Sequence, residues 1–210
     1  MQFKPLDRLA MVLTLLLAVD AGGSLLGALP PGTFDAIGNE RDASTLLAQA
    51  TALLSLAGMM AASFIATVVL FCVWINRAAK NLRAFEPGGV FEYTPGWAVG
   101  WFFIPFANLF RPFAAIKEIW TRSDSSENYG IVPGLLSAWW AAWIISNLVD
   151  RLALRMDDAP GVQWLSAGLD VVAAICCILV VRRVTALQNE RAAVVLPERI
   201  RVSRSTPAAT

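Results

Sequence analysis

Apolar runs of about 20 residues recur along this chain of 210 residues, and they constrain its fold more than any other feature. An α-helix rises about 1.5 Å per residue, so a run of this length matches the roughly 30 Å hydrocarbon core of a bilayer. The pattern predicts an all-α integral membrane protein with four transmembrane helices. The four runs cover residues of about 9–29, 46–76, 131–150 and 162–182.

Composition excludes several other classes of protein. Hydrophobic residues make up 57% of the chain and charged residues 16%, against about 25% charged residues in a soluble domain. This balance excludes a disordered chain, a disulfide-rich scaffold and a nucleic-acid-binding domain. The chain has no histidine, and Cys72, Cys176 and Cys177 lie in apolar runs, where they are expected to act as small apolar side chains. The sequence has no phosphate-binding loop, nucleophile elbow or zinc spacing, so we expect no catalytic residue, cofactor, metal or enzyme activity.

The segment 97–122 departs from the pattern of full-length runs. Its apolar part, WAVGWFFIPFANLF over residues 97–110, is too short to span a membrane, and Arg111 follows it directly. Pro105 and Pro112 each lack a backbone N–H, so a straight helix through the segment is not expected. The sequence predicts a proline-broken helical hairpin, which either re-enters the membrane or lies flat at its interface.

The basic residues indicate the sidedness of the four spans. If the segment 97–122 returns to the side it came from, all of the 17 Lys and Arg residues except Arg41, Arg151 and Arg155 lie on one side of the membrane. If the segment crosses, the basic residues divide almost evenly. Cytoplasmic loops carry an excess of Lys and Arg, so the first arrangement is favoured, with both termini in the cytoplasm.

Residues 1–190 are expected to form a single membrane domain, followed by a basic cytoplasmic tail over residues 191–210. The basic chain after Arg182 predicts contact with anionic lipid, since each basic residue near a membrane surface contributes about 1 kcal/mol. The alternative is that these residues only set the topology. The lipid bilayer is the main partner expected, and the tail is too short to indicate binding to nucleic acid.

Asp20 and Asp170 lie inside the first and fourth spans, at nearly equal distances from the outer ends. Carboxylates inside a membrane are costly, and they are functional candidates by default. Their matched depth allows them to meet across a helix interface and form a cation or proton site. The alternative is that each bonds a nearby hydroxyl or amide. Suitable groups in the outer half are Ser24, Ser55, Ser146 and Asn147.

Small residues recur at the spacing that lets membrane helices approach closely. Gly23 and Gly27 form one such pair, and Gly58 begins another row. They predict tight packing within the chain or, alternatively, contact with a membrane-protein partner or a second copy. The tryptophans near the predicted span ends fit an interfacial belt, whereas Trp139, Trp140 and Trp143 lie nearer the middle. The belt comprises Trp74, Trp97, Trp101, Trp120 and Trp164.

The central part of the chain carries a distinctive block of residues. It reads W-x-x-R-A-x-x-N from Trp74 to Asn81, then P-x-W-A-V-G-W-F-F-I-P-x-A-N-L-x-x-P from Pro95 to Pro112, then E-I-W from Glu118. This block resembles a bacterial membrane-protein family called domain of unknown function 4328, over about residues 45–190. The resemblance implies a multi-pass protein of the bacterial inner membrane, and it supplies no catalytic residue.

The same block predicts how the hairpin is held. Trp74, Arg77 and Asn81 fall on one helix face that emerges level with the hairpin. Non-helical backbone at membrane depth must be buried in protein or line a wet cavity, so Arg77, Asn81 and Asn108 are expected to supply hydrogen bonds around Pro105. We interpret the block as a hairpin locked onto the bundle, and the alternative is a cytoplasmic gate or ligand mouth. The hairpin and docking face comprise Trp74, Arg77, Asn81, Trp97, Trp101, Pro105, Asn108, Arg111, Pro112 and Glu118.

Two functions agree with these features. The first is a non-catalytic scaffold or regulatory membrane subunit, favoured by the small extramembrane mass and the small-residue faces. The second is a small transporter or channel subunit that uses Asp20 and Asp170 as an intramembrane cation or proton site. A polar cavity that joins the two aspartates to a surface would favour transport, and a dry, sealed bundle would favour the scaffold.

Overall fold

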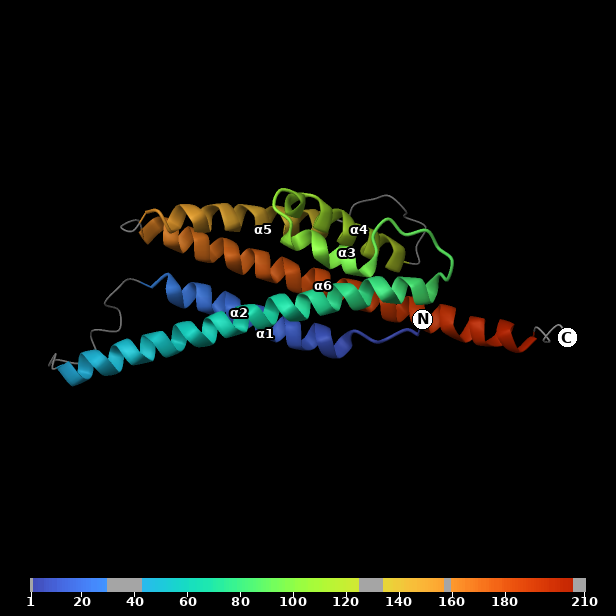
Figure 1. Cartoon of the computed structure of the whole chain (residues 1–210), viewed down its shortest axis with the longest axis horizontal. Helices are drawn as coiled ribbons and strands as arrows, with labels where there is room; N and C mark the ends of the chain where they lie inside the picture. The colour runs from blue at the N-terminus through green and yellow to red at the C-terminus, as the bar shows by residue number, and fades with distance from the viewer. Residues whose placement is uncertain (1, 30–42, 125–133, 157–159, 206–210) are drawn as a thin grey trace.

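The computed structural model describes residues 2–29, 43–124, 134–156 and 160–205, and it contains helices and no strand over those ranges. Its long helices form one elongated bundle (Figure 1). We call the end where the N-terminus lies and α2 finishes the terminal end, and the opposite end the loop end. The long helices are α1 (Asp7–Gly27), α2 (Ala43–Phe85), α5 (Gly134–Ala153) and α6 (Pro160–Ser205).

Three of these helices are long and apolar enough to cross a membrane, within the residues that the structure describes: Asp7–Gly27, Leu46–Phe85 and Pro160–Pro197. They correspond to the first, second and fourth predicted spans. The third span forms as α5, but its sequence falls short of the same apolarity. Tryptophans and the polar residues Asn147 and Asp150 interrupt its aliphatic run. The apolar criterion therefore supports three of the four predicted spans, and a fourth is reached only by counting the bent hairpin, which was predicted not to cross. Residues 131–133 of this predicted span lie outside the described residues.

The two halves of α2 have different surroundings. Over residues 46–65 the apolar side chains are largely exposed, with Leu54 at 75%. From Thr67 onward one face is buried, and Trp74 and Ile75 are fully enclosed. Figure 1 shows the reason: the first half extends past α1 at the loop end, whereas the second half lies against other helices. The sequence predicted the helix and its end before Pro87 correctly.

α6 continues through the expected boundary between domain and tail. It is one helix from Pro160 to Ser205, and Leu187 and Ala192 lie in the core. The helix therefore continues past residue 190 without a break, and Ala192 still lies in the core. The apolar positions of α6 keep a helical spacing past Arg182, so the same face stays buried beyond the membrane-length run.

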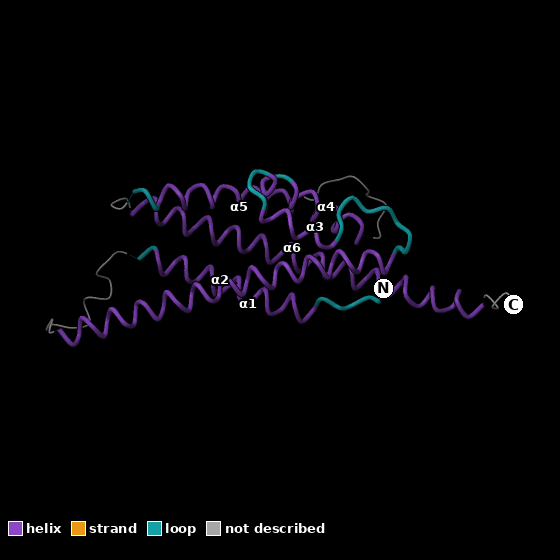
Figure 2. The backbone as a smooth tube through the Cα atoms, viewed as in Figure 1, coloured by secondary structure: helices purple, strands orange, loops and turns teal. Residues whose placement is uncertain are grey.

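The hairpin consists of two arms that meet at a break. The first arm is α3 (Pro95–Gly100) with the 3₁₀ turn η2 (Trp101–Phe103), and the second is the turn η3 (Ala107–Leu109) with α4 (Arg111–Ser123). The arms are bent by 113°. The chain enters the first arm and leaves the second arm on the side of the terminal end, and the arms meet at a tip that points away from it (Figure 2). The predicted proline break is therefore confirmed as a bend in the backbone.

The break itself is a tight turn at Phe106. This residue has φ 64° and ψ −46°, and the Ala107 N–H donates to the Pro105 carbonyl at 2.8 Å. These features define a γ-turn of the rare positive-φ kind, which is strained for a residue with a side chain. Pro105 fixes its own φ and cannot continue the first arm, so the chain reverses here.

The core lies toward the terminal end, and it includes two tryptophans that were predicted to be interfacial. Trp74 and Trp120 are buried at 0% and 7% exposure, so they do not belong to an interfacial belt, whereas Trp97 and Trp164 are exposed as predicted. The prediction of tight small-residue packing is also wrong at Gly27 and Gly58, where an added Cβ atom would meet nothing within 4 Å. Gly23 is approached closely, but by the flexible Met60 side chain.

Candidate functional site

A cavity of about 550 Å³ lies among the four long helices and the tip of the hairpin. Its polar side chains come from every one of these elements, so the cavity exists only in the assembled bundle. We call it the acidic cavity because three of its side chains are carboxylates. Its polar lining consists of Asp20, Ser24, Thr67, Asn108, Ser146, Asn147, Asp150 and Asp170.

Asp20 extends from α1 toward α2, where two hydroxyl groups meet it. Ser63 Oγ donates to Asp20 Oδ1, and Thr67 Oγ1 donates to Asp20 Oδ2, each at 2.6 Å. Ser63 and Thr67 are four residues apart, so they lie on one face of α2. Both carboxylate oxygens thus have a donor, as one alternative from the sequence anticipated, although these hydroxyls were not among the groups expected to supply it.

Asp170 lies on α6, where the hydroxyls of Ser24 and Ser146 interact with its carboxylate. These two partners were among the groups expected from the sequence. Asp150 lies close enough for its charge to act on Asp170, and its Oδ1 accepts a hydrogen bond from Ser166 Oγ. The sequence suggested that Asp20 and Asp170 could meet, and both do line the same cavity.

Asp150 is the acid that sequence reasoning missed. Residue 150 is the last position of the third predicted span and was given no role there, but α5 continues to Ala153 and carries Asp150 into the cavity wall. A signal was available in the spacing, because Trp143, Ser146 and Asp150 are separated by three and four residues. Positions at this spacing share one helix face.

Aromatic side chains form much of the remaining wall. Phe71 packs edge-on against Phe102 and Trp139, with ring centroids 5.9 and 6.0 Å apart. Trp140 stacks on Trp143 at 4.9 Å, and its Nε1 donates to the Leu109 carbonyl at 3.0 Å. The mid-span tryptophans therefore pack the bundle and anchor the hairpin tip, and Trp139 and Trp143 also face the acidic cavity.

The charge of this wall is negative. None of the described residues that line it is Lys or Arg, so the three carboxylates have no basic partner there. Asn108 adds a further acceptor, because its Oδ1 is buried without a hydrogen-bond partner among the described residues. Over the described ranges, no three His, Cys, Asp or Glu side chains are arranged to hold a metal ion.

The predicted docking face splits in two in the structure. Trp74 Nε1 donates to Thr185 Oγ1 of α6 at 3.2 Å, and Arg77 Nη1 donates to the Pro5 carbonyl at 3.4 Å. The expectation that Arg77 and Asn81 surround Pro105 is wrong, because the N-terminal segment and α6 occupy that face. Asn76 meets the hairpin instead, and its Nδ2 donates to the Pro95 carbonyl at 2.8 Å.

Asn81 is the centre of a buried polar network. Its Nδ2 donates to the Lys4 carbonyl and to Gln188 Oε1, each at 2.9 Å, and its Oδ1 accepts from the Lys4 N–H at 3.0 Å. Gln188 Nε2 donates to the Ala78 carbonyl and to Ser123 Oγ, each at 3.1 Å. Two fully buried amides thus join the N-terminal segment, α2, α4 and α6.

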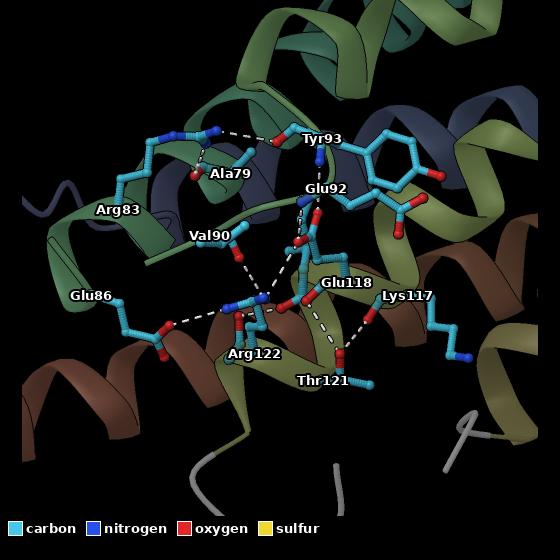
Figure 3. A network of polar contacts seen from close by, with 12 residues as sticks. Ala79, Arg83, Glu86, Val90, Glu92, Tyr93, Lys117, Glu118, Thr121 and Arg122 are labelled. Atoms are coloured by element: carbon cyan, nitrogen blue, oxygen red, sulfur yellow. Dashed lines mark hydrogen bonds and ion pairs between the residues drawn. The ribbon is translucent and has the colours of Figure 1, made fainter. Parts of the chain in front are cut away.

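The hairpin residues Arg111 and Glu118 both contact the chain that leads into α3. Glu118 accepts the N–H groups of Glu92 and Tyr93 at 2.8 and 3.1 Å (Figure 3). Arg111 reaches the Tyr93 hydroxyl at 3.5 Å and lies 5.4 Å from the Trp101 ring centroid. Pro112 is buried in the first turn of α4. The first residue of α4 and its middle are therefore both held to the segment just before α3, Arg111 through the Tyr93 side chain and Glu118 through the backbone of Glu92 and Tyr93.

An ion-pair network closes the terminal end. Arg122 Nη1 lies 3.2 Å from Glu86 Oε2, and Arg191 pairs with the other oxygen of Glu86. Phe91 lies on the loop that joins α2 to the hairpin. The Cζ atoms of Arg83 and Arg122 each lie 4.8 Å from its ring centroid. Burial is the largest cause that raises the pKa of the nearby Tyr93 phenol above its ordinary value. This network keeps its charges paired, unlike the acidic cavity.

These observations define a class: an α-helical bundle with helices of membrane-spanning length, a bent hairpin and an acid-lined cavity. The chain belongs to the family described as domain of unknown function (DUF4328), which matches residues 39–186. The resemblance seen in the block between Trp74 and Trp120 is thereby confirmed. No curated protein and no solved structure matches the chain.

Proposed function

We propose that this protein is a small transporter or channel subunit that takes up a cation in the acidic cavity. One observation carries the proposal: Asp20, Asp150 and Asp170 line a single cavity in which the described wall has no Lys or Arg. Carboxylates away from water are costly unless they are paired or exchange their charge with a ligand. A cation that enters the cavity supplies the missing positive charge.

The proposal includes a membrane setting. Both arms of the hairpin lie toward the terminal end, where α2 finishes and the N-terminus lies. With that end in the cytoplasm, the hairpin re-enters the bacterial inner membrane from the cytoplasmic side. Most basic residues then lie inside, in agreement with the positive-inside rule. The proposed role is non-catalytic, and the hairpin tip forms the inner wall of the cavity.

Flux from proteoliposomes tests this function. The protein is reconstituted with an imposed pH gradient, and proton movement is followed with a pH-sensitive dye and cation uptake with radioactive rubidium ion, which does not cross the bilayer unaided. Asp20→Asn and Asp170→Asn are each expected to lower the active flux about tenfold or more, because each removes a charge from the cavity. Glu190→Gln, which removes an exposed charge outside the cavity, should leave it unchanged.

Parent protein that gives no proton or rubidium flux above protein-free vesicles would refute transport by this cavity. Equal flux in the parent and both aspartate variants would also do so. Trp139 and Trp143, two of the eight tryptophans, line the cavity, so part of the tryptophan fluorescence should change when rubidium binds there.

A non-catalytic scaffold or regulatory subunit is the second candidate function. The observation that favours it is the first half of α2, where Leu47, Leu54 and Met59 are 69%, 75% and 64% exposed. Such a surface faces either lipid or another membrane protein. Cysteines introduced at these positions distinguish the two, because a partner slows thiol labelling in native membranes relative to protein purified in detergent. Equal labelling in both settings argues against a scaffold.

A further inference from the structure

A second cavity lies on the opposite side of Cys72 from the acidic cavity and has the opposite charge. It measures about 630 Å³ and opens between the N-terminal segment, α2 and α3. Lys4, Arg77 and Lys80 line it, and none of the described lining residues is Asp or Glu. We call it the basic cleft.

The fold holds these three positive charges together. Asn81 is 1% exposed and binds both the N–H and the carbonyl of Lys4, at 3.0 and 2.9 Å, so the backbone of Lys4 is fixed beside α2. Leu6 is fully buried and anchors the same segment. Arg77 uses one donor on the Pro5 carbonyl at 3.4 Å. Neither Lys4 nor Lys80 forms an ion pair with a described acid, so the charges repel one another unless an anion joins them.

The polarity of the cleft changes along its length. Cys72, Val73 and Val99 form one apolar side of the cleft, which we call the apolar floor, and Val73 is 42% exposed there, while Lys4 and Lys80 are also exposed. Cys72 and Lys80 are eight residues apart on one helix, which corresponds to about 12 Å. This gradient matches a molecule with a negatively charged head and an apolar body.

We propose that the basic cleft binds a phosphate group, with Lys4, Arg77 and Lys80 as the groups that recognise it. The apolar floor favours the phosphate of an anionic phospholipid over that of a soluble compound. This site does not depend on the proposed cation function, because it is a separate cavity with its own lining. Arginine pairs with phosphate through two N–H groups, and lysine contributes as a point charge.

The test is lipid binding by the full chain, delipidated in a zwitterionic detergent and titrated with phosphatidylglycerol, with bound lipid counted by native mass spectrometry. Lys4→Gln combined with Lys80→Gln should weaken the affinity by about tenfold or more, because each charge contributes a few-fold at a membrane surface. The matched control is Arg151→Gln with Arg155→Gln, which removes two exposed charges at the loop end, away from the cleft, and should change the affinity by less than about twofold.

A second arm identifies the source of the phosphate. Inorganic phosphate at about ten millimolar should not displace the lipid if the acyl chains contribute through the apolar floor. Displacement by phosphate would assign the cleft to a soluble phosphate compound instead. Equal weakening in the two double variants would overturn the proposal, because the effect would then come from net charge alone.

Salt provides a readout that needs no variant. The affinity of the parent protein should fall as NaCl rises from about 50 to about 500 mM, since exposed charges are screened over that range. If the double variant fails to fold, Lys80→Gln alone carries the comparison, because this side chain is exposed and leaves the Asn81 network intact. An affinity that does not depend on salt in the parent overturns the proposal.

Discussion

The terminal end of the bundle and the acidic cavity differ in whether their buried polar side chains have partners within the protein. At the terminal end, Asn81 and Gln188 are fully buried and use donors and acceptors on four separate segments. In the cavity, the carboxylates have hydroxyl partners but no positive charge, and Asn108 Oδ1 has no partner among the described residues. A satisfied buried network stabilises a fold, whereas unmatched polar groups are retained where a ligand completes them.

The same difference separates the two ends of the hairpin from its tip. The ends of α4 and the loop before α3 are held by ion pairs and hydrogen bonds at the terminal end. The hairpin tip projects from that fixed base to the cavity, where Trp140 holds it through the Leu109 carbonyl. If the cavity takes up a cation as proposed, this held base would keep the tip in one position in the cavity wall.

Asn81→Ala tests the terminal side of the comparison and should have the largest effect. The substitution leaves Gln188 Oε1 and the Lys4 backbone without partners inside the protein, so the free energy of unfolding should fall by about 3 kcal/mol. Thermal unfolding in detergent measures the loss. Asn189→Ala, which removes the same group from a position that bonds Asp7 near the surface, should have little effect. Equal stability in the two variants would show that the network is not the base of the fold.

Glu86→Gln should have an intermediate effect. It removes the negative charge shared by Arg122 and Arg191, and these side chains are 30% and 11% exposed. Solvent screens part of the interaction, so we expect a loss of about 1–2 kcal/mol in unfolding free energy. Glu92→Gln is the matched control because Glu92 is 68% exposed and lies 4.0 Å from Arg111. A control that destabilises as much as Glu86→Gln would remove the distinction.

Asp170→Asn should have the smallest effect on stability. Unlike the two substitutions above, it should not lower the free energy of unfolding. Neutralising this acid relieves its repulsion with Asp150, so thermal stability should stay the same or rise by up to about 1 kcal/mol while flux is lost. Chemical unfolding of the variant beside Asp7→Asn measures the change. Destabilisation comparable to that of Asn81→Ala would show that the acid is structural, and the contrast between the two regions would fail.

The helices themselves could be predicted because their signals are local. The first, second and fourth apolar runs became α1, the membrane-length part of α2 and the first part of α6, and Pro87 follows the end of α2 closely. Pro105 and Pro112 gave the broken hairpin because proline acts on its own backbone and on the preceding residue. Spacing along one chain was sufficient for each of these conclusions.

The contacts between helices could not be predicted in the same way. Tryptophan is common at membrane interfaces, and Trp74 lies near the end of a predicted span. In the structure Trp74 is nevertheless fully buried, and it bonds Thr185 of α6. Gln188 gave no signal, because an amide in a basic stretch is ordinary until its partners on α2 and α4 are known. Asp20 and Asp170 were found because a charge inside an apolar run is unusual, whereas Asp150 at the end of such a run is not. Partner identity is a property of the assembled fold.

Cys72 of α2 lines both the acidic cavity and the basic cleft, so the two sites of opposite charge share one wall residue. If an occupant of either proposed site shifted α2 at Cys72, the lining of the other cavity would change as well. Thermodynamic reciprocity then fixes the magnitude: whatever factor an anion in one site applies to cation affinity, the cation applies to the anion. Surface charge of the surrounding lipid would in this way become an allosteric variable.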